Sequence, residues 1–270
     1  RTRVREPLFV IGVPRSGTTF LHRLLALDEE RFTTTALWEL IFAPSITQRW
    51  FWLGVAGLDR RLGRPLARAM GRFERGVLGG LDDIHSTGLR APEEDYLALA
   101  PVLGCFLLVL PLPDERLWRL AYADRDLSER EKRRILRFYR RFVQRHLWFH
   151  GSGKTFLSKN PSFTPLLHAL AEEFPDAHFV ACFRNPTRAV PSQINSILVG
   201  ARIFRGRRID ADYWRDGLSQ MLRFYYQHLF HAPRVLDEYR FGQMQLEKLA
   251  PDPESALLAL YAEFNWTPDD

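Results

Sequence analysis

A short run near the start of the chain combines three hydroxyl side chains, a glycine and a positive charge. The run reads Pro14-Arg15-Ser16-Gly17-Thr18-Thr19. It follows the mostly apolar residues 7–13 and precedes an apolar-periodic segment that begins at Phe20. This pattern predicts a buried strand, a tight loop and a helix. Because the loop N–H groups and the positive end of the helix dipole then face one point, we predict an anion site there, most simply for a phosphate. The plainer alternative is a strand-to-helix turn with capping hydroxyls.

The loop departs from the motif of nucleoside triphosphatases. That motif, G-x-x-x-x-G-K-[ST], needs a lysine directly before its Ser or Thr. Here the cation is Arg15, which stands inside the loop. The sequence therefore favours binding of a terminal 5′-phosphate over cleavage of a β,γ-phosphate bond.

A second candidate phosphate site lies farther along the chain. The apolar run 178–183 ends at Arg184, and Ser192 follows eight residues later, in a segment that we expect to be a helix. A guanidinium and a hydroxyl that converge on one oxyanion suit a phosphate distinct from the first. A nucleotide phosphorylated at both its 5′ and 3′ positions would need two such sites.

Together these motifs resemble those of sulfotransferases that use 3′-phosphoadenosine 5′-phosphosulfate (PAPS). Between them lies Ser158-Lys159-Asn160-Pro161, which is similar to the K-x-P element of the bacterial-type and carbohydrate-type branch of that superfamily. The resemblance implies a P-loop-like α/β fold, a three-layer sandwich with a central parallel sheet flanked by helices. It also implies PAPS as co-substrate and 3′-phosphoadenosine 5′-phosphate (PAP) as product.

The resemblance assigns roles to individual residues. Arg15 takes the place of the Lys or Arg that contacts the bridging oxygen of the donor. The remaining cofactor-binding residues fall into a 5′-phosphate group, Ser16, Gly17, Thr18 and Thr19, and a 3′-phosphate group, Arg184 and Ser192.

Sulfuryl transfer by in-line attack requires charge neutralisation on the leaving oxygen and a base for the acceptor proton. We expect Arg15 and Lys159 to neutralise charge, without a metal ion. Two candidates for the base stay open, His85 in a polar loop and Glu39 after Trp38. The acids Glu93 and Glu94 are expected in the first turn of a helix.

Three functions are consistent with these motifs. The first is sulfuryl transfer to a hydroxyl of a small molecule, lipid or carbohydrate. The alternatives are a nucleotide kinase-like P-loop enzyme and a non-catalytic module that binds PAPS or PAP. Residues 50–52, Trp-Phe-Trp, and the basic segment after them suggest an apolar acceptor pocket with a positive rim.

Length and composition indicate one α/β domain spanning residues 1–270, with a helical substrate-side insertion at about 46–150. The 38 Lys and Arg against 32 Asp and Glu give a net charge of +6. The excess is mostly arginine, which suits anionic ligands. The basic residues are scattered and come without a zinc-ligand spacing or an aromatic RNA-binding motif, so we do not expect nucleic acid as a partner. The oligomeric state is not readable from the sequence.

Cys105 and Cys182 both lie in apolar surroundings, so we expect no disulfide and a cytoplasmic location. The apolar runs 50–58 and 102–112 are too short or too interrupted to span a bilayer. The chain begins with Arg rather than Met, which leaves open a removed leader or a longer protein. No copy of the basic loop that covers the nucleotide in this family is evident before Asp270.

We predict the following elements from periodicity, capping residues and breakers: one or two helices over 46–80 that lie over the sheet as a lid or substrate-side subdomain, a buried helix or hairpin over 97–110, helices over 128–150, 163–174, 210–230 and 253–264, and strands over 155–158, 178–183 and 243–246.

Overall fold

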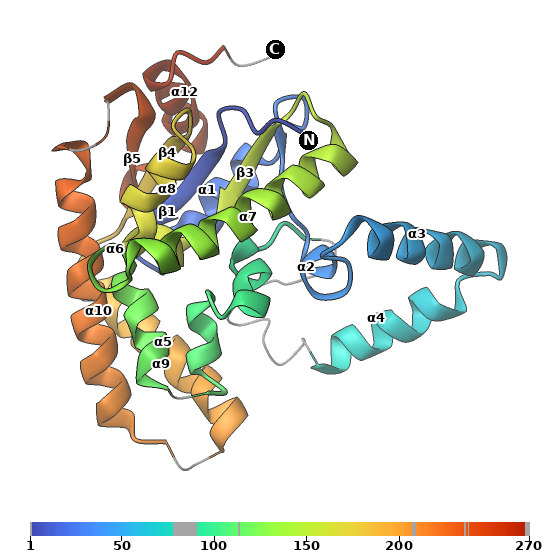
Figure 1. Cartoon of the computed structure of the whole chain (residues 1–270), viewed down its shortest axis with the longest axis horizontal. Coiled ribbons are helices and arrows are strands. Elements are labelled where there is room, and N and C mark those ends of the chain that lie inside the picture. The colour runs from blue at the N-terminus through green and yellow to red at the C-terminus, as the bar shows by residue number, and fades with distance from the viewer. Residues whose placement is uncertain are drawn as a thin grey trace.

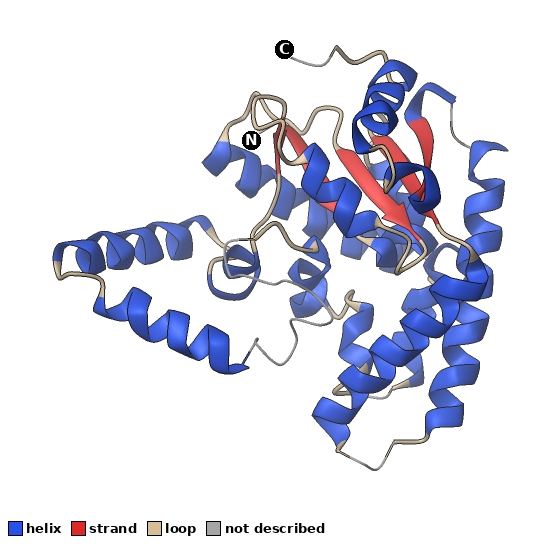
Figure 2. Ribbon diagram, turned by 180° about the vertical axis from the view of Figure 1, so that it is seen from behind, coloured by secondary structure: helices blue, strands red, loops and turns tan. Residues whose placement is uncertain are grey.

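The computed structural model describes residues 2–77, 91–112, 114–206, 209–234, 236 and 238–267. Its centre is a five-stranded parallel sheet with the order β2-β3-β1-β4-β5 (Figures 1 and 2). The strands are β1 (Leu8–Gly12), β2 (Phe32–Thr33), β3 (Thr155–Lys159), β4 (His178–Phe183) and β5 (Phe241–Gln245). The predicted parallel sheet is confirmed.

Helices cover both faces of this sheet, because the strand side chains alternate between two cores. Leu8 and Val10 of β1 pack with residues of α1 (Thr18–Leu25) and α12 (Pro253–Glu263). Phe9 and Ile11 face the opposite way, toward the long helices α7 and α10. The result is the expected three-layer sandwich.

The core that contains Phe9 and Ile11 includes residues of four helices that lie close to the predicted ranges. They are α7 (Glu129–His150), α8 (Leu167–Glu173), α9 (Pro186–Arg205) and α10 (Ala211–His231). Ser128 caps α7 and Glu131 reaches back to it, so the two residues form a capping box at the start of the helix. Shorter elements complete the chain: α2 (Leu37–Phe42), α5 (Glu115–Trp118), α6 (Ala123–Asp126), α11 (Leu246–Leu249) and the 3₁₀ helices η1 (Asp95–Val102), η2 (Phe106–Val109), η3 (Arg119–Tyr122), η4 (Pro161–Leu166), η5 (Ala232–Arg234) and η6 (Glu238–Arg240).

Two helices stand apart from the sandwich. α3 (Ile46–Arg61) and α4 (Pro65–Val77) form a hairpin that projects away from the sheet (Figures 1 and 2). We call residues 46–77 the arm. The predicted helices are therefore present. They project from the sheet instead of lying over it as a lid, and their assignment to a substrate-side subdomain stays a prediction. Their apolar residues did not reveal which surface they would face.

The segment around Pro92 also differs from the prediction. Glu93 and Glu94 precede η1 in extended backbone instead of lying in the first turn of a helix. Pro92 pairs with Ala36 in an antiparallel bridge, and the Glu93 N–H donates to the Thr35 carbonyl at 2.9 Å. These pairings hold the two acids beside the start of α2.

Cys105 and Cys182 are buried free thiols, as predicted. Among the described helices, none is both long and apolar enough to cross a membrane.

Candidate functional site

The loop between β1 and α1 depends on two glycines. Gly12 packs against the backbone of Cys182 on β4, where a Cβ atom would lie only 2.4 Å from the carbonyl oxygen. Gly17 begins α1 with φ of 90°, a left-handed conformation that favours glycine. Ser16 is buried, and its hydroxyl donates to the carbonyl oxygens of Val13 and Cys182, the latter at 2.9 Å. The loop is thus a tightly held turn against the sheet.

This turn leaves a row of backbone donors available. Within the described part of the chain, the N–H groups of residues 15–19 donate to no protein acceptor. They stand at the positive end of α1, a helix that has no acidic residue in its first turn. Free amides at a helix N-terminus form an anion site. The geometry therefore agrees with a phosphate bound by Gly17, Thr18 and Thr19.

Arg15 connects this turn to the second motif. It has a φ of 69°, which is unusual for a residue with a side chain. Its Nε donates to Ser192 Oγ at 3.1 Å, and its carbonyl accepts from Arg184 Nη1 at 3.3 Å. The structure thus brings Arg15, Arg184 and Ser192 together. The sequence predicted that Arg184 and Ser192 converge on one oxyanion, and in the structure each of them is hydrogen-bonded to Arg15.

The backbone of Arg184 is held by a contact from α10. Its carbonyl accepts from Tyr226 Oη of α10 at 2.7 Å. A cavity of about 1050 Å³ opens beside it. Its lining includes Arg184, Tyr226, Phe230 and Gln243. Aromatic rings, an amide and a guanidinium are groups that can bind a nucleoside and its phosphate.

Lys159 ends β3 on the other side of the turn. Its side chain is buried, and Nζ donates to Thr19 Oγ1 at 3.1 Å. Nζ also lies 3.0 Å from Glu94 Oε1 and 3.7 Å from Glu93 Oε1. A buried ammonium is stable only with such partners. Lys159 therefore links the phosphate turn to two carboxylates.

Those two carboxylates are fixed by the residue that follows them. Asp95 is fully buried and accepts a short hydrogen bond from the Tyr139 hydroxyl on α7. Burial raises the pKa of Asp95 to about 7. Glu93 and Glu94 remain partly exposed.

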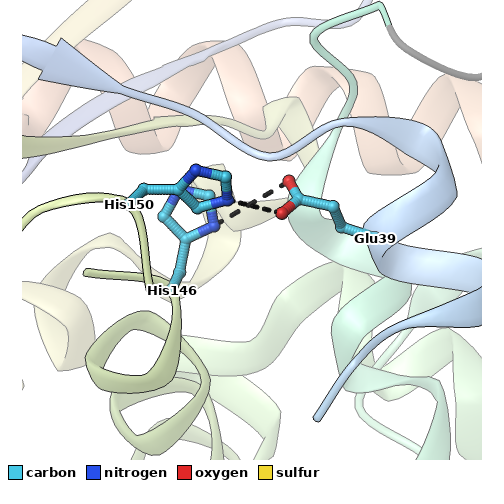
Figure 3. A group of neighbouring side chains, drawn as sticks. All are labelled: Glu39, His146 and His150. Atoms are coloured by element: carbon cyan, nitrogen blue, oxygen red, sulfur yellow. Dashed lines mark hydrogen bonds and ion pairs between the residues drawn. The ribbon is translucent and has the colours of Figure 1, made fainter. Parts of the chain in front are cut away.

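Glu39, a candidate for the base, lies elsewhere in a buried cluster (Figure 3). Oε1 accepts from His150 Nε2 at 2.6 Å and lies 3.2 Å from Arg49 Nη1, and Oε2 accepts from the Ala36 N–H at 2.9 Å. Burial raises the pKa of Glu39, but the His150 hydrogen bond and the Arg49 charge outweigh burial, so the pKa is lowered overall. A carboxylate with both oxygens engaged and a lowered pKa is a weak base.

The same cluster gathers ligand-type atoms from Glu39, His146 and His150 (Figure 3). The Arg49 guanidinium lies among them, 3.5 Å from His146 Nδ1, and supplies the positive charge that the carboxylate needs. Burial lowers the pKa of His146 well below its usual value, so its ring is neutral. This arrangement is that of a buried ion pair.

The other candidate base, His85, lies outside the described residues. The sequence reasoning also missed Arg49, His146 and His150 as partners of Glu39. The spacing of four between the two histidines on a predicted helix was a signal that could have grouped them.

Comparison with known proteins agrees with this geometry. A model of the "Sulfotransferase family" matches residues 7–270, so the chain belongs to that family. The curated relatives include omega-hydroxy-beta-dihydromenaquinone-9 sulfotransferase Stf3 of Mycobacterium tuberculosis and of Mycobacterium bovis. Each is 28% identical over 255 residues, which cover 94% of this chain and 61% of the relative. The chain thus spans less than two thirds of the length of these relatives.

Solved structures share the fold. The chain is similar to sulfotransferase STF9 from Mycobacterium avium, with a TM-score of 0.76 and 19% identity over 98% of this chain and 65% of that one. It is also similar to sulfotransferase STF1 from Mycobacterium tuberculosis, with a TM-score of 0.70 and 20% identity over 100% of this chain and 70% of that one. The family resemblance and the fold predicted from the motifs are confirmed.

Proposed function

We propose that the chain transfers a sulfuryl group from PAPS to a hydroxyl group of its acceptor. The observation that supports this most is the position of Arg15, which belongs to the 5′-phosphate turn and is hydrogen-bonded to both residues of the 3′-phosphate motif. A ligand with phosphates at both ends of a nucleoside matches this pair of linked sites. Family membership supports the same donor.

In this proposal the chain's residues act on donor and acceptor as follows. The free amides of residues 15–19 and the hydroxyls of Thr18 and Thr19 bind the 5′-phosphate. Arg184 and Ser192 bind the 3′-phosphate. Arg15 and Lys159 stabilise the negative charge that develops on the bridging and sulfonate oxygens. The acceptor oxygen forms a bond to sulfur, the bond from sulfur to the bridging oxygen breaks, and the bisphosphate leaves with the electron pair.

The acceptor proton must pass to a base. Glu94 is in a suitable position, because its carboxylate is partly exposed and lies 3.0 Å from the Lys159 ammonium. A base beside the cation that contacts the sulfonate would face the incoming hydroxyl. His85 remains a second prediction for this role. Glu39 is disfavoured because Arg49 and His150 already engage its carboxylate.

For the acceptor we propose an apolar molecule with a hydroxyl group, such as a hydroxylated lipid. The relatives named above are, by name, sulfotransferases of an omega-hydroxy menaquinone. Incubation with radiolabelled PAPS and a panel of hydroxylated lipids, sugars and small phenols tests both donor and acceptor. We expect label in a lipid product, and loss of that product in Lys159→Ala. Hydrolysis of ATP with Mg²⁺ in place of transfer from PAPS would contradict the proposal.

A further inference from the structure

The arm, residues 46–77, exposes a large apolar surface. Trp50, Phe51, Leu58 and Leu62 follow one another at spacings that place them on one side of α3. Phe51 is 62% exposed and Leu62 is 67% exposed. On α4, Leu66 and Met70 are exposed four residues apart. Contiguous exposed apolar side chains of this kind mark an interaction surface.

The arm also carries most of the net charge of the chain. Residues 46–77 contain seven arginines, no lysine, one aspartate and one glutamate. Seven minus two gives +5, against +6 for the whole chain. Five of these arginines are exposed, and among the described side chains no carboxylate pairs with them: Arg60, Arg61, Arg64, Arg68 and Arg72.

One of the two acids of the arm lies away from its surface. Asp59 is buried, and its carboxylate accepts from the N–H groups of Leu66 and Ala67 at 2.7 and 3.1 Å. It thereby ties the end of α3 to the start of α4. The base of the arm is fixed by Arg49, which pairs with Glu39, and by Trp50, which packs edge to face on Phe149 of α7. The arm is therefore a helical hairpin that is held at its turn by Asp59 and at its base by contacts with Glu39 and α7.

We propose that the arm is a membrane-binding element that lies on an anionic lipid surface. Trp, Phe and Leu side chains enter the boundary between head groups and acyl chains, while arginines reach the phosphates of anionic lipids. Charge complementarity selects this occupant over a second copy of the chain, because two arms that each carry +5 repel one another. The described helices of the arm lie on the bilayer, since none of them is apolar enough to span it.

The arm begins next to the candidate site. The chain enters the arm through α2, and the start of α2 is paired with residues 91–94 at Ala36 and Pro92. Glu94, in this paired segment, contacts Lys159. If the proposed function holds, a bilayer-bound arm keeps the acceptor side of the site next to the lipid surface from which an apolar acceptor would come.

Vesicle sedimentation tests the proposal directly. We expect the chain to sediment with vesicles of phosphatidylcholine and phosphatidylglycerol, to bind pure phosphatidylcholine more weakly, and to dissociate as salt is raised. The pair Phe51→Ser and Leu62→Ser should weaken binding roughly ten-fold or more. The pair Arg61→Gln and Arg72→Gln should weaken it roughly five-fold per arginine.

Matched controls distinguish membrane binding through the arm from nonspecific adsorption through other exposed residues. Leu27 and Ile203 are 77% and 61% exposed outside the arm, so Leu27→Ser with Ile203→Ser should leave vesicle binding unchanged. Arg141→Gln with Arg223→Gln, also exposed and outside the arm, serves as the charge control.

Three results would overturn the proposal: no vesicle binding, equal binding by the arm variants and the wild type, or self-association that the arm variants abolish in the absence of lipid. PAP titration of every variant checks that the site is intact. A chain that binds vesicles but not PAP would contradict the proposed function and would still support the arm as a membrane-binding element.

Discussion

Arg15 and Ser192 lie 177 positions apart in the sequence, yet the Arg15 Nε donates to Ser192 Oγ at 3.1 Å. One residue belongs to the turn after β1 and the other to the first turns of α9. Because β1 and β4 are neighbours in a parallel sheet, their carboxyl ends place the two following segments side by side. The two motifs that we predict to bind phosphate therefore lie side by side.

The Arg15 and Ser192 hydrogen bond should be measurable as a coupling energy. We expect Arg15→Gln and Ser192→Ala to weaken PAP binding, and the double variant to show a coupling of roughly 0.5 to 2 kcal/mol, because each single change removes the shared bond. Titration calorimetry on the four proteins gives the value. Ser196→Ala, one turn farther along α9, is the control and should bind PAP normally. Strictly additive losses would show that the two residues act independently.

Glu94 should matter for turnover more than for nucleotide binding. Glu94→Gln removes the base beside Lys159 and should lower kcat roughly 10²-fold while PAP affinity stays near that of wild type. Glu93→Gln, whose carboxylate is farther from Lys159, is the matched control and should lose less. A Glu94→Gln enzyme with full activity would remove Glu94 from the mechanism.

His85 and Glu39 make a second comparison. If His85 takes the acceptor proton instead, His85→Ala should lower kcat by roughly 10²-fold or more without weakening PAP binding. A His85→Ala variant with wild-type kcat would exclude His85 as the base.

Glu39→Gln should act on stability. It leaves Arg49 buried without its carboxylate, which costs about 3 kcal/mol of unfolding free energy. Replacing both residues by Met should recover part of that loss, as thermal denaturation would show. A stable Glu39→Gln enzyme with a large kcat loss would return the base role to Glu39.

The sequence predicted four of the five strands and the turn after β1 because these features are local, whereas the two-residue strand β2 was missed. An apolar run that ends in Pro and Gly, such as residues 7–17, has few alternatives to a buried strand and a turn. Arg184 and Ser192 could be assigned for the same reason, since a strand end and a helix start determine where they point.

The partners of Glu39 and Lys159 could not be predicted in this way. Glu39 meets His150 across more than 100 residues of chain and meets Arg49 of the next helix inside the same buried cluster. Glu94, which meets Lys159, belongs to a segment that is paired with Ala36 at Pro92. Such contacts depend on tertiary packing. The arm shows the same limit: periodicity identified its helices, but packing decided that they project from the sheet.

Buried histidines should make the fold sensitive to acid. Burial, together with the nearby Lys159 charge, lowers the pKa of His22 to about 3, and burial lowers that of His146 well below its usual value. Both rings are neutral in the folded chain, whereas the unfolded chain takes up protons below about pH 6.5. Stability is therefore full above that pH and falls as pH decreases toward 3, by about 1.4 kcal/mol per pH unit for each histidine.

Denaturation at several pH values measures this slope. His22→Gln should reduce the slope between about pH 6 and about pH 4, a window that lies below the unfolded pKa of about 6.5. His231→Gln, at an exposed position, should leave the slope unchanged. A slope unchanged in His22→Gln would show that His22 takes up its proton in the folded chain.

The most direct test of the central claim is the affinity for PAP compared with that for AMP, measured by calorimetry on the wild type and on Arg184→Ala. Two linked phosphate sites predict that PAP binds much more tightly than AMP. They also predict that Arg184→Ala loses about 2 to 4 kcal/mol of PAP binding while AMP binding changes little. Equal affinities for PAP and AMP in the wild type would contradict the assignment of a 3′-phosphate site to Arg184 and Ser192, and with it the proposed use of PAPS.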